Sequence, residues 1–161
     1  MSVLKLIPAC KDCLWGGHRL VDEYNKEYDG DILAETWELS CHPDGPSRIA
    51  NGRYAGKTLA EYIEAEGKGV LGNHCRRFRD FPILIKFIDA KQDLSVQVHP
   101  DNRYALKNEG QYGKTEMWYV VDAGEDATLY YGFKQEISKE EFAERIQNDT
   151  VLDVLNKVPV Q

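Results

Sequence analysis

Residues 94–99 constrain the fold more than any other stretch, because their side chains alternate between apolar and polar. The apolar positions are Leu94, Val96 and Val98, and the polar positions are Ser95, Gln97 and His99. A repeat of two residues predicts a β-strand whose two faces differ in character. We therefore expect the Gln97 amide and the His99 imidazole to point to the same side of this strand.

A second stretch, residues 116–122, supplies a carboxylate in a similar setting. Glu116 shares a face with Trp118 and Val120, and Lys114 joins that face if the strand begins early enough. Amide, imidazole and carboxylate groups form a mixed ligand set that suits a borderline divalent cation such as zinc. Strands would fix that geometry before a substrate arrives. The alternative is structural, with His99 ending a strand and Glu116 facing solvent.

Size and charge exclude several classes of protein. The chain of 161 residues predicts one domain, residues 1–161, with a core that needs no disulfide or metal staple. A net charge of -7 argues against nucleic-acid binding and leaves phosphate recognition to a few local basic side chains. No apolar run reaches the length of a membrane span, and the first residues lack a signal-peptide core. We expect a cytoplasmic protein without membrane contact.

The cysteines give a weak signal. Cys10 and Cys13 have the spacing of a zinc knuckle or a redox pair, but Cys41 and Cys75 are isolated. No second pair completes a four-thiolate site. We therefore expect reduced, unpaired cysteines, as is usual in the cytosol.

Local signals in the first half predict strands and one short helix. Residues 32–40 alternate as a strand does, and the prolines and glycine of residues 41–46 end it. Asn51-Gly52 predicts a hairpin turn between residues 47–50 and 53–54. A capping box from Thr58 to Glu61 begins an amphipathic helix that Gly67 stops.

Residues 81–87 form an almost wholly apolar strand that contains Lys86. A lysine in such a strand is costly unless its ammonium group reaches a polar cavity or a partner. Lys86 is therefore a better functional candidate than the lysines of the helices. The basic group at residues 76–79 is expected to face water.

Signals in the second half predict a further strand and two helices. Residues 101–113 resemble a polar loop at the rim of a cleft. Residues 128–133 form a strand, and a capping box from Ser138 to Glu141 begins a helix through Ile146. A short helix is expected at residues 151–155. Strands without βαβ alternation predict a mainly β fold, an antiparallel sandwich or barrel with a few inserted helices.

Two motifs resemble those of a known family. Residues 95–101, Ser-Val-Gln-Val-His-Pro-Asp, and residues 113–119, Gly-Lys-Thr-Glu-Met-Trp-Tyr, are similar to the signature of type I phosphomannose isomerases. Residues 14–17, 35–40 and 84–90 extend the resemblance to the short bacterial form of that family. The resemblance implies a cupin jelly roll and one zinc ion. It also implies interconversion of mannose 6-phosphate and fructose 6-phosphate through an enediol.

The resemblance also assigns roles to individual residues. Gln97, His99 and Glu116 would be metal ligands, and Lys114 would hold a substrate hydroxyl or relay a proton. Ser95 and Lys86 would suit the phosphate of the substrate. Trp15 would lie near the mouth of the cleft, and His42 could assist ring opening. The alternatives are core packing for Trp15 and a packed or exposed loop position for His42.

The family pattern is not complete in this chain. Family members have a fourth ligand, a histidine in a later Pro-x-Gly-x-x-His segment, and an essential arginine beyond it, whereas this sequence stops at Gln161. We therefore expect the N-terminal portion of a longer enzyme, a jelly roll incomplete at its C-terminus, with weak or no activity alone. Its open sheet edges would permit a homodimer.

Two other functions fit the same residues. A non-catalytic cupin that binds a sugar or sugar phosphate is favoured by the missing arginine and fourth ligand. An iron-dependent cupin dioxygenase fits less well, because Gln97 stands where such sites usually have a histidine.

Overall fold

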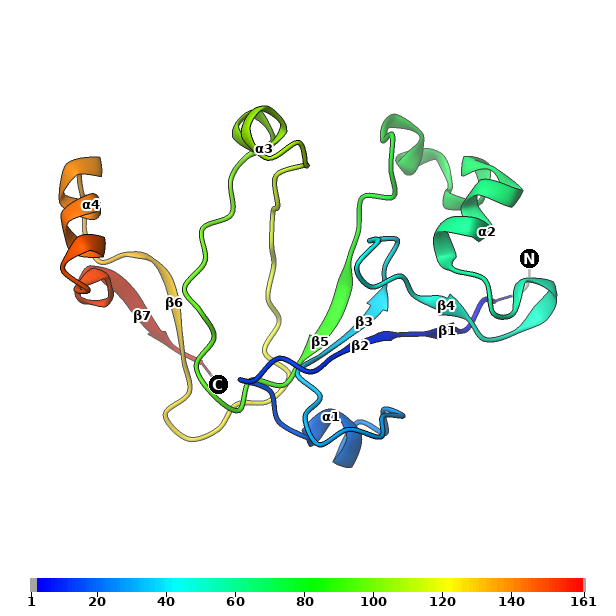
Figure 1. The fold of residues 1–161 in the computed structure, drawn as a ribbon, viewed down its shortest axis with the longest axis horizontal. Coiled ribbons are helices and arrows are strands. Elements are labelled where there is room, and N and C mark those ends of the chain that lie inside the picture. Colours follow the sequence, from blue (N-terminus) through cyan, green and yellow to red (C-terminus); the bar gives the residue numbers. More distant parts are fainter. Residues whose placement is uncertain (1–2, 161) are drawn as a thin grey trace. The chain divides into compact units, whose positions relative to one another are not determined.

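The computed structural model describes residues 3–160, which form two compact units (Figure 1). Unit 1 ends at Leu94 and unit 2 begins at Ser95. Each unit has its own strands and helices. The single domain expected from the chain length stays a prediction.

Unit 1 is built on a three-stranded antiparallel sheet with β3 at its centre. The order is β2 (Ala9–Lys11), β3 (Glu35–Leu39) and β5 (Ile85–Ile88). A two-stranded sheet pairs β1 (Leu6–Ile7) with β4 (Arg48–Ile49). The helical segments are α1 (Arg19–Asp22), η1 (Gly52–Tyr54), α2 (Leu59–Glu66), η2 (Lys68–Leu71) and η3 (Asn73–Arg77).

The core of unit 1 is made of apolar side chains from α1, β4, α2 and the segment just before β3. Leu33, Ala34 and Ile49 are fully buried, and Leu20 and Leu59 are nearly so. The turn at Trp15-Gly16-Gly17 lies against this core. A Cβ on Gly16 would come within 2.5 Å of the Ala34 Cα, so glycine is needed for the close approach of the two backbones.

Unit 2 contains a separate two-stranded sheet with helices beside it. Antiparallel strands β6 (Thr128–Phe133) and β7 (Leu155–Pro159) form the sheet. The helical segments are α3 (Asn102–Asn108), α4 (Lys139–Gln147) and η4 (Val151–Asp153). Phe142 of α4 packs edge-on against Phe133 of β6, with ring centroids 5.4 Å apart.

Several predicted elements are confirmed. The fold is sheet-rich with a few helices, and its sheets are not closed. Strand β3 lies within the predicted range 32–40, and β6 matches residues 128–133. At the start of α2 both reciprocal bonds of the capping box between Thr58 and Glu61 are present. At α4 the Ser138 hydroxyl accepts from the Glu141 amide as predicted.

The hairpin predicted at Asn51-Gly52 is wrong. Residues Arg48–Ile49 pair with β1 instead, and Gly52, at φ +72, begins η1. The Asn51 side chain explains the difference, because its Oδ1 accepts from Lys5 N at 2.8 Å and its Nδ2 donates to Val3 O at 3.0 Å. Asn51 therefore ties the chain to the N-terminal segment. The chain turns back over a longer stretch, because Ile49 N donates to Lys57 O and Gly56 N donates to Ile49 O, both at 2.8 Å.

The strands predicted at residues 94–99 and 116–122 are not formed as ladders. Both segments are extended in Figure 1, but within residues 3–160 no neighbouring backbone pairs with either to form a strand. Alternation fixes which way side chains point, whereas a strand also needs a hydrogen-bonded neighbour. Several apolar side chains of these segments are consequently exposed, among them Val98, Met117 and Tyr119.

Two further predictions need correction in unit 2. The loop expected at residues 101–113 contains α3, whose first turn is capped by Asp101 Oδ1 accepting from Tyr104 N at 2.8 Å. The helix expected at residues 151–155 is only the short turn η4, after which the chain enters β7. Leu155 was expected to be helical, but it pairs with Phe133 of β6 instead. Only 8% of Leu155 is exposed, so this pairing also buries its side chain.

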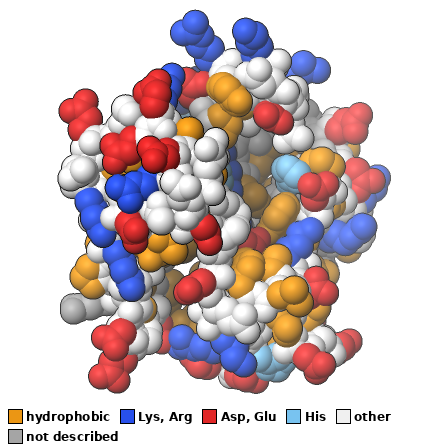
Figure 2. All heavy atoms as spheres, turned by 60° about the vertical axis from the view of Figure 1, so that its left-hand side comes forward, with side chains coloured by type: hydrophobic (Ala, Val, Ile, Leu, Met, Phe, Trp, Pro, Cys, Tyr) orange, Lys and Arg blue, Asp and Glu red, His pale blue; other side chains and the backbone are white. Residues whose placement is uncertain are grey.

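The surface carries both signs of charge. Figure 2 shows acidic and basic side chains interspersed on the displayed face, with hydrophobic side chains between them. Among the described residues, no helix combines the length and the apolar character that a membrane crossing requires.

Candidate functional site

The segments that carry the predicted ligands are joined at a tight crossing in unit 2. Lys114 N donates to Pro100 O at 3.2 Å, and Gly113 N donates to Asn102 Oδ1 at 2.9 Å. A Cβ on Gly113 would lie 2.4 Å from Pro100 O, so a larger residue would push the segments apart. These contacts bring the segment that contains His99 beside the segment that contains Glu116.

His99, Glu116 and Lys114 form one cluster. His99 Nε2 lies 2.9 Å from Glu116 Oε2, and Lys114 Nζ lies 2.8 Å from Glu116 Oε1. All three side chains are partly buried, with 25%, 28% and 43% of the side chain exposed for His99, Glu116 and Lys114. The cluster therefore sits at a surface that a small molecule can reach.

The charge of Glu116 is stabilised within this cluster. Partial burial by itself raises the pKa of the carboxyl group. The hydrogen bond and the charge of Lys114 lower the pKa, as do hydrogen bonds from His99 and Trp118. These effects outweigh that of burial, so the pKa of Glu116 is lowered overall. Glu116 is thus held as a carboxylate, which is the form that binds metal.

Gln97 and Ser95 form a second pair. Gln97 Nε2 donates to Ser95 Oγ at 3.1 Å, as expected for residues two apart on one side of an extended segment. Because the amide nitrogen is engaged by the hydroxyl, the amide oxygen is the atom that Gln97 can offer a cation. The hydrogen bond fixes which end of the amide does so.

Two of the candidate donors of unit 2, His99 and Glu116, are close enough to share a divalent cation. Two ligand atoms about 2.1 Å from a tetrahedral zinc ion are roughly 3.4 Å apart. The 2.9 Å between His99 Nε2 and Glu116 Oε2 is about 0.5 Å shorter than that separation, so the two side chains would open slightly around an ion. Among residues 3–160, no group of three or more His, Cys, Asp or Glu side chains is placed to hold a metal. A site here would therefore depend on the Gln97 amide as its third protein donor.

Unit 1 carries the remaining candidates, and it gives Lys86 a partner. Lys86 Nζ lies 3.0 Å from Glu35 Oε1, and Trp37 Nε1 donates to Glu35 Oε2 at 2.6 Å. The ring of His42 packs edge-on against Trp37, with centroids 5.6 Å apart. The structure thus connects His42 and Lys86 through Trp37 and Glu35.

Sequence reasoning assigned no role to Glu35 or Trp37. A signal was present, because Glu35 and Trp37 are two residues apart in a strand and so share a face. Pairing with the strand that contains Lys86 could not be read from the sequence. The cross-strand register, Trp37 opposite Lys86, brings the carboxylate and the ammonium together.

Trp15 is half-buried, and its backbone carbonyl accepts hydrogen bonds from Lys91 N and Gln92 N at 3.1 and 2.9 Å. This closes the turn that contains the buried Gly16. Its place near a cleft stays a prediction.

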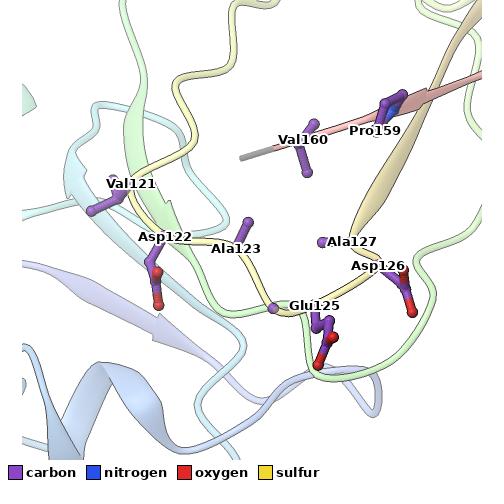
Figure 3. A pocket seen from close by; sticks show the side chains of 9 residues that line it. Val121, Asp122, Ala123, Glu125, Asp126, Ala127, Pro159 and Val160 are labelled. Atoms are coloured by element: carbon purple, nitrogen blue, oxygen red, sulfur yellow. The ribbon is translucent and has the colours of Figure 1, made fainter.

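A hollow of about 540 Å³ in unit 2 contains none of the predicted site residues. It is lined by residues 121–127 together with Pro159 and Val160 (Figure 3). Asp122, Glu125 and Asp126 belong to this lining and would repel an anionic ligand. The hollow is therefore not suited to a sugar phosphate.

Comparison with known proteins identifies the family. Residues 3–125 match the model of the phosphomannose isomerase type I catalytic domain. The chain belongs to this family. The family's matched region contains every candidate site residue of both units.

Curated relatives and a solved structure agree with that family. The chain is 43% identical over 148 residues to a mannose-6-phosphate isomerase of Streptococcus mutans, covering 92% of this chain and 46% of that protein. It is 36% identical to the mannose-6-phosphate isomerase ManA of Bacillus subtilis, covering 96% of this chain and 48% of ManA. The chain thus spans about half the length of these relatives.

The crystal structure of a mannose 6-phosphate isomerase from Bacillus subtilis superposes with a TM-score of 0.91 at 38% identity. The match covers 100% of this chain and 50% of that one. The predicted cupin-like, mainly β fold is confirmed by this likeness.

Proposed function

We propose that this chain acts in the interconversion of mannose 6-phosphate and fructose 6-phosphate, as an aldose–ketose isomerase that uses zinc. The observation that carries the proposal is the His99–Glu116–Lys114 cluster, which lies inside the matched family region. Curated relatives of the chain are named for this activity. The cytoplasmic location and the homodimer expected from the sequence belong to the same proposal.

The reaction moves one proton between neighbouring carbons of the sugar. The proton leaves C2 of the aldose, an enediol forms, and a proton is delivered to C1, while the carbonyl passes from C1 to C2. Negative charge develops on the carbonyl oxygen during each transfer, so a nearby positive group lowers the barrier. A residue that holds or relays protons must lie beside that oxygen.

Residues of unit 2 supply these groups. His99, Glu116 and the Gln97 amide oxygen would hold zinc, which when bound supplies a positive charge for the sugar oxygens. Lys114 carries an ammonium 2.8 Å from Glu116. That contact orients its remaining N–H groups, and the proposal assigns them to a substrate hydroxyl and to proton relay. Ser95 offers a hydroxyl beside Gln97 for substrate.

Residues of unit 1 would recognise the substrate. Lys86 offers a cation suited to the phosphate group. Because the net charge of the chain is -7, long-range attraction does not favour an anionic substrate, and local cations must provide the binding. His42 lies beside Trp37 and is proposed to assist ring opening, and Trp15 is proposed to line the approach to the sugar.

A coupled assay for fructose 6-phosphate tests the proposal. Zinc-loaded chain should form fructose 6-phosphate from mannose 6-phosphate at a low but measurable rate, in keeping with the weak activity expected from the sequence, and chelation should abolish the reaction. Lys114→Met should lower turnover at least a hundredfold, as general acid–base groups typically contribute. Lys107→Met, at an exposed position on α3, is the matched control and should leave the rate unchanged.

Two results would contradict the proposal. Turnover that survives both chelation and Lys114→Met would remove the proposed site from the reaction. Phosphate-dependent binding of the sugar without any turnover would identify the non-catalytic cupin instead.

A further inference from the structure

The face of the three-stranded sheet in unit 1 that carries Lys86 also carries a carboxylate and an indole. Register places Lys11 of β2 opposite Glu35 of β3, and Lys86 of β5 opposite Trp37. Glu35 is 8% exposed, and the Lys86 side chain is 19% exposed. A carboxylate this deeply buried is costly unless donors satisfy it.

Glu35 is satisfied by two donors on two different oxygens. Oε1 accepts from Lys86 Nζ at 3.0 Å, and Oε2 accepts from the indole Nε1 of Trp37 at 2.6 Å. Each oxygen is thereby assigned to one partner, so the carboxylate cannot rotate without breaking both bonds. The Lys86 ammonium is directed by the oxygen it faces, which leaves its other hydrogens for a ligand.

The indole is itself held on three sides. Lys11 Nζ lies 4.7 Å from the centroid of the Trp37 ring, and the His42 ring packs edge-on at 5.6 Å. A Cβ on Gly45 would come within 2.7 Å of Trp37 Cε3, so the chain passes directly against the ring. A fixed indole fixes its N–H and therefore the carboxylate that accepts from it.

We infer that Glu35 and Trp37 position Lys86 for the phosphate of the substrate. The inference rests on the proposed function, in which Lys86 binds that phosphate. It adds that Lys86 binds well only when Glu35 accepts from the ammonium and the indole at the same time. Glu35 does not touch the ligand and acts through Lys86.

Glutamine at position 35 tests this with almost no change in shape. Glutamine has one acceptor oxygen and one NH₂ donor, whereas Lys86 and Trp37 both donate. Glu35→Gln must therefore leave one of them facing another donor. Trp37→Phe removes the indole N–H, so in the double variant the amide can turn its NH₂ toward the phenyl ring and its oxygen toward Lys86.

Titration calorimetry of the full chain with mannose 6-phosphate, and with mannose as the ligand without phosphate, provides the measurement. Glu35→Gln should weaken mannose 6-phosphate binding about tenfold, the effect of losing one hydrogen bond to a charged group. Glu35→Gln with Trp37→Phe should bind within about threefold of Trp37→Phe alone. Mannose binding should not change, and thermal unfolding should show that each variant is folded.

Glu38→Gln is the matched control. Glu38 lies on the same strand, and its carboxylate pairs with Lys26 at 2.8 Å and accepts from Thr36, on the other face of the sheet. This variant should bind mannose 6-phosphate like the unaltered chain. Glu38→Gln also breaks a lysine–carboxylate pair on β3, but not the pair with Lys86. Comparing the two variants therefore shows whether the loss of binding comes from the contact to Lys86 in particular.

The remaining outcomes separate the inference from the proposed function. If Lys86→Met abolishes phosphate-dependent binding while Glu35→Gln does not weaken it, positioning is overturned and the role of Lys86 stands. Equal weakening in Glu35→Gln and the double variant also overturns positioning, because no rescue occurs. If the unaltered chain shows no phosphate-dependent binding, or Lys86→Met retains it, the proposed role of Lys86 fails and the inference fails with it.

Discussion

His99 Nε2 and Glu116 Oε2 lie 2.9 Å apart although 17 residues separate them in the sequence. The chain turns back between them through α3, and the crossing at Gly113 sets their approach. A nitrogen and a carboxylate oxygen at this separation can share a proton or a cation.

Glu116→Gln should weaken zinc binding by more than about tenfold, because loss of outer-sphere partners alone costs that much in known sites. Competition with a chromophoric chelator at neutral pH measures the affinity. Glu125→Gln removes an acidic residue of the turn before β6 and should leave the affinity unchanged. Equal affinity of Glu116→Gln and the unaltered chain would show that Glu116 is not a ligand.

Gly16→Ala should destabilise unit 1 by about 1–3 kcal/mol, the usual cost of forcing a methyl group into a packed site. Its Cβ would meet the Ala34 Cα at 2.5 Å. Gly69→Ala is the control, because a Cβ there meets nothing within 4 Å. Urea unfolding followed by tryptophan fluorescence measures both. A Gly16→Ala variant as stable as the control would mean that the backbones do not approach so closely.

Thr58→Ala should lower the melting temperature of the chain by about 2–4 °C at pH 7, the usual effect of losing an N-cap in a chain of this size. The Thr58 hydroxyl accepts from Glu61 N, and Glu61 accepts from the Thr58 amide and hydroxyl.

The same variant carries a pH dependence. Hydrogen bonds from the Thr58 backbone and side chain lower the pKa of Glu61. A carboxyl group with a lowered pKa stabilises the fold above its unfolded pKa, and the contribution disappears as the pH falls through the folded pKa. The difference in melting temperature between the unaltered chain and Thr58→Ala should therefore shrink in acid. A difference that is constant from pH 7 to pH 3 would contradict the role of Glu61.

Cys41 should resist alkylation near pH 8. Burial raises the pKa of its thiol to about 11, so roughly one molecule in a thousand carries the reactive thiolate at that pH. The exposed Cys13 should react first with iodoacetamide. Peptide mass spectrometry after timed labelling measures each site, with Cys41→Ser to confirm the assignment. Labelling of Cys41 as fast as Cys13 would show that its thiol is not buried.

Local structure was predictable wherever a few neighbouring residues satisfy one another. The capping box from Thr58 to Glu61 is such a case, because both of its bonds lie within four residues. Alternation in residues 32–40 also predicted β3. Asn51-Gly52 failed as a two-residue hairpin turn, because its asparagine bonds to residues 46 and 48 positions away and Ile49 pairs with the chain only at Gly56 and Lys57.

In the candidate site, too, contacts between neighbouring residues were predictable from the sequence and contacts between distant residues were not. Alternation predicted that Gln97 and Ser95 share a side, and they form a hydrogen bond. Its position in an apolar strand singled out Lys86, but its partner Glu35 is 51 residues away and depends on the β3–β5 register.

The sequence by itself determined the family, the alternation of side chains in the extended segments, and the residue types that could hold a cation and a phosphate. Tertiary structure alone decided which of them meet. It placed His99 against Glu116 and Lys86 against Glu35, because strand register and the close crossing at Gly113 are set by backbone contacts between distant segments. Such contacts leave no local pattern in the chain.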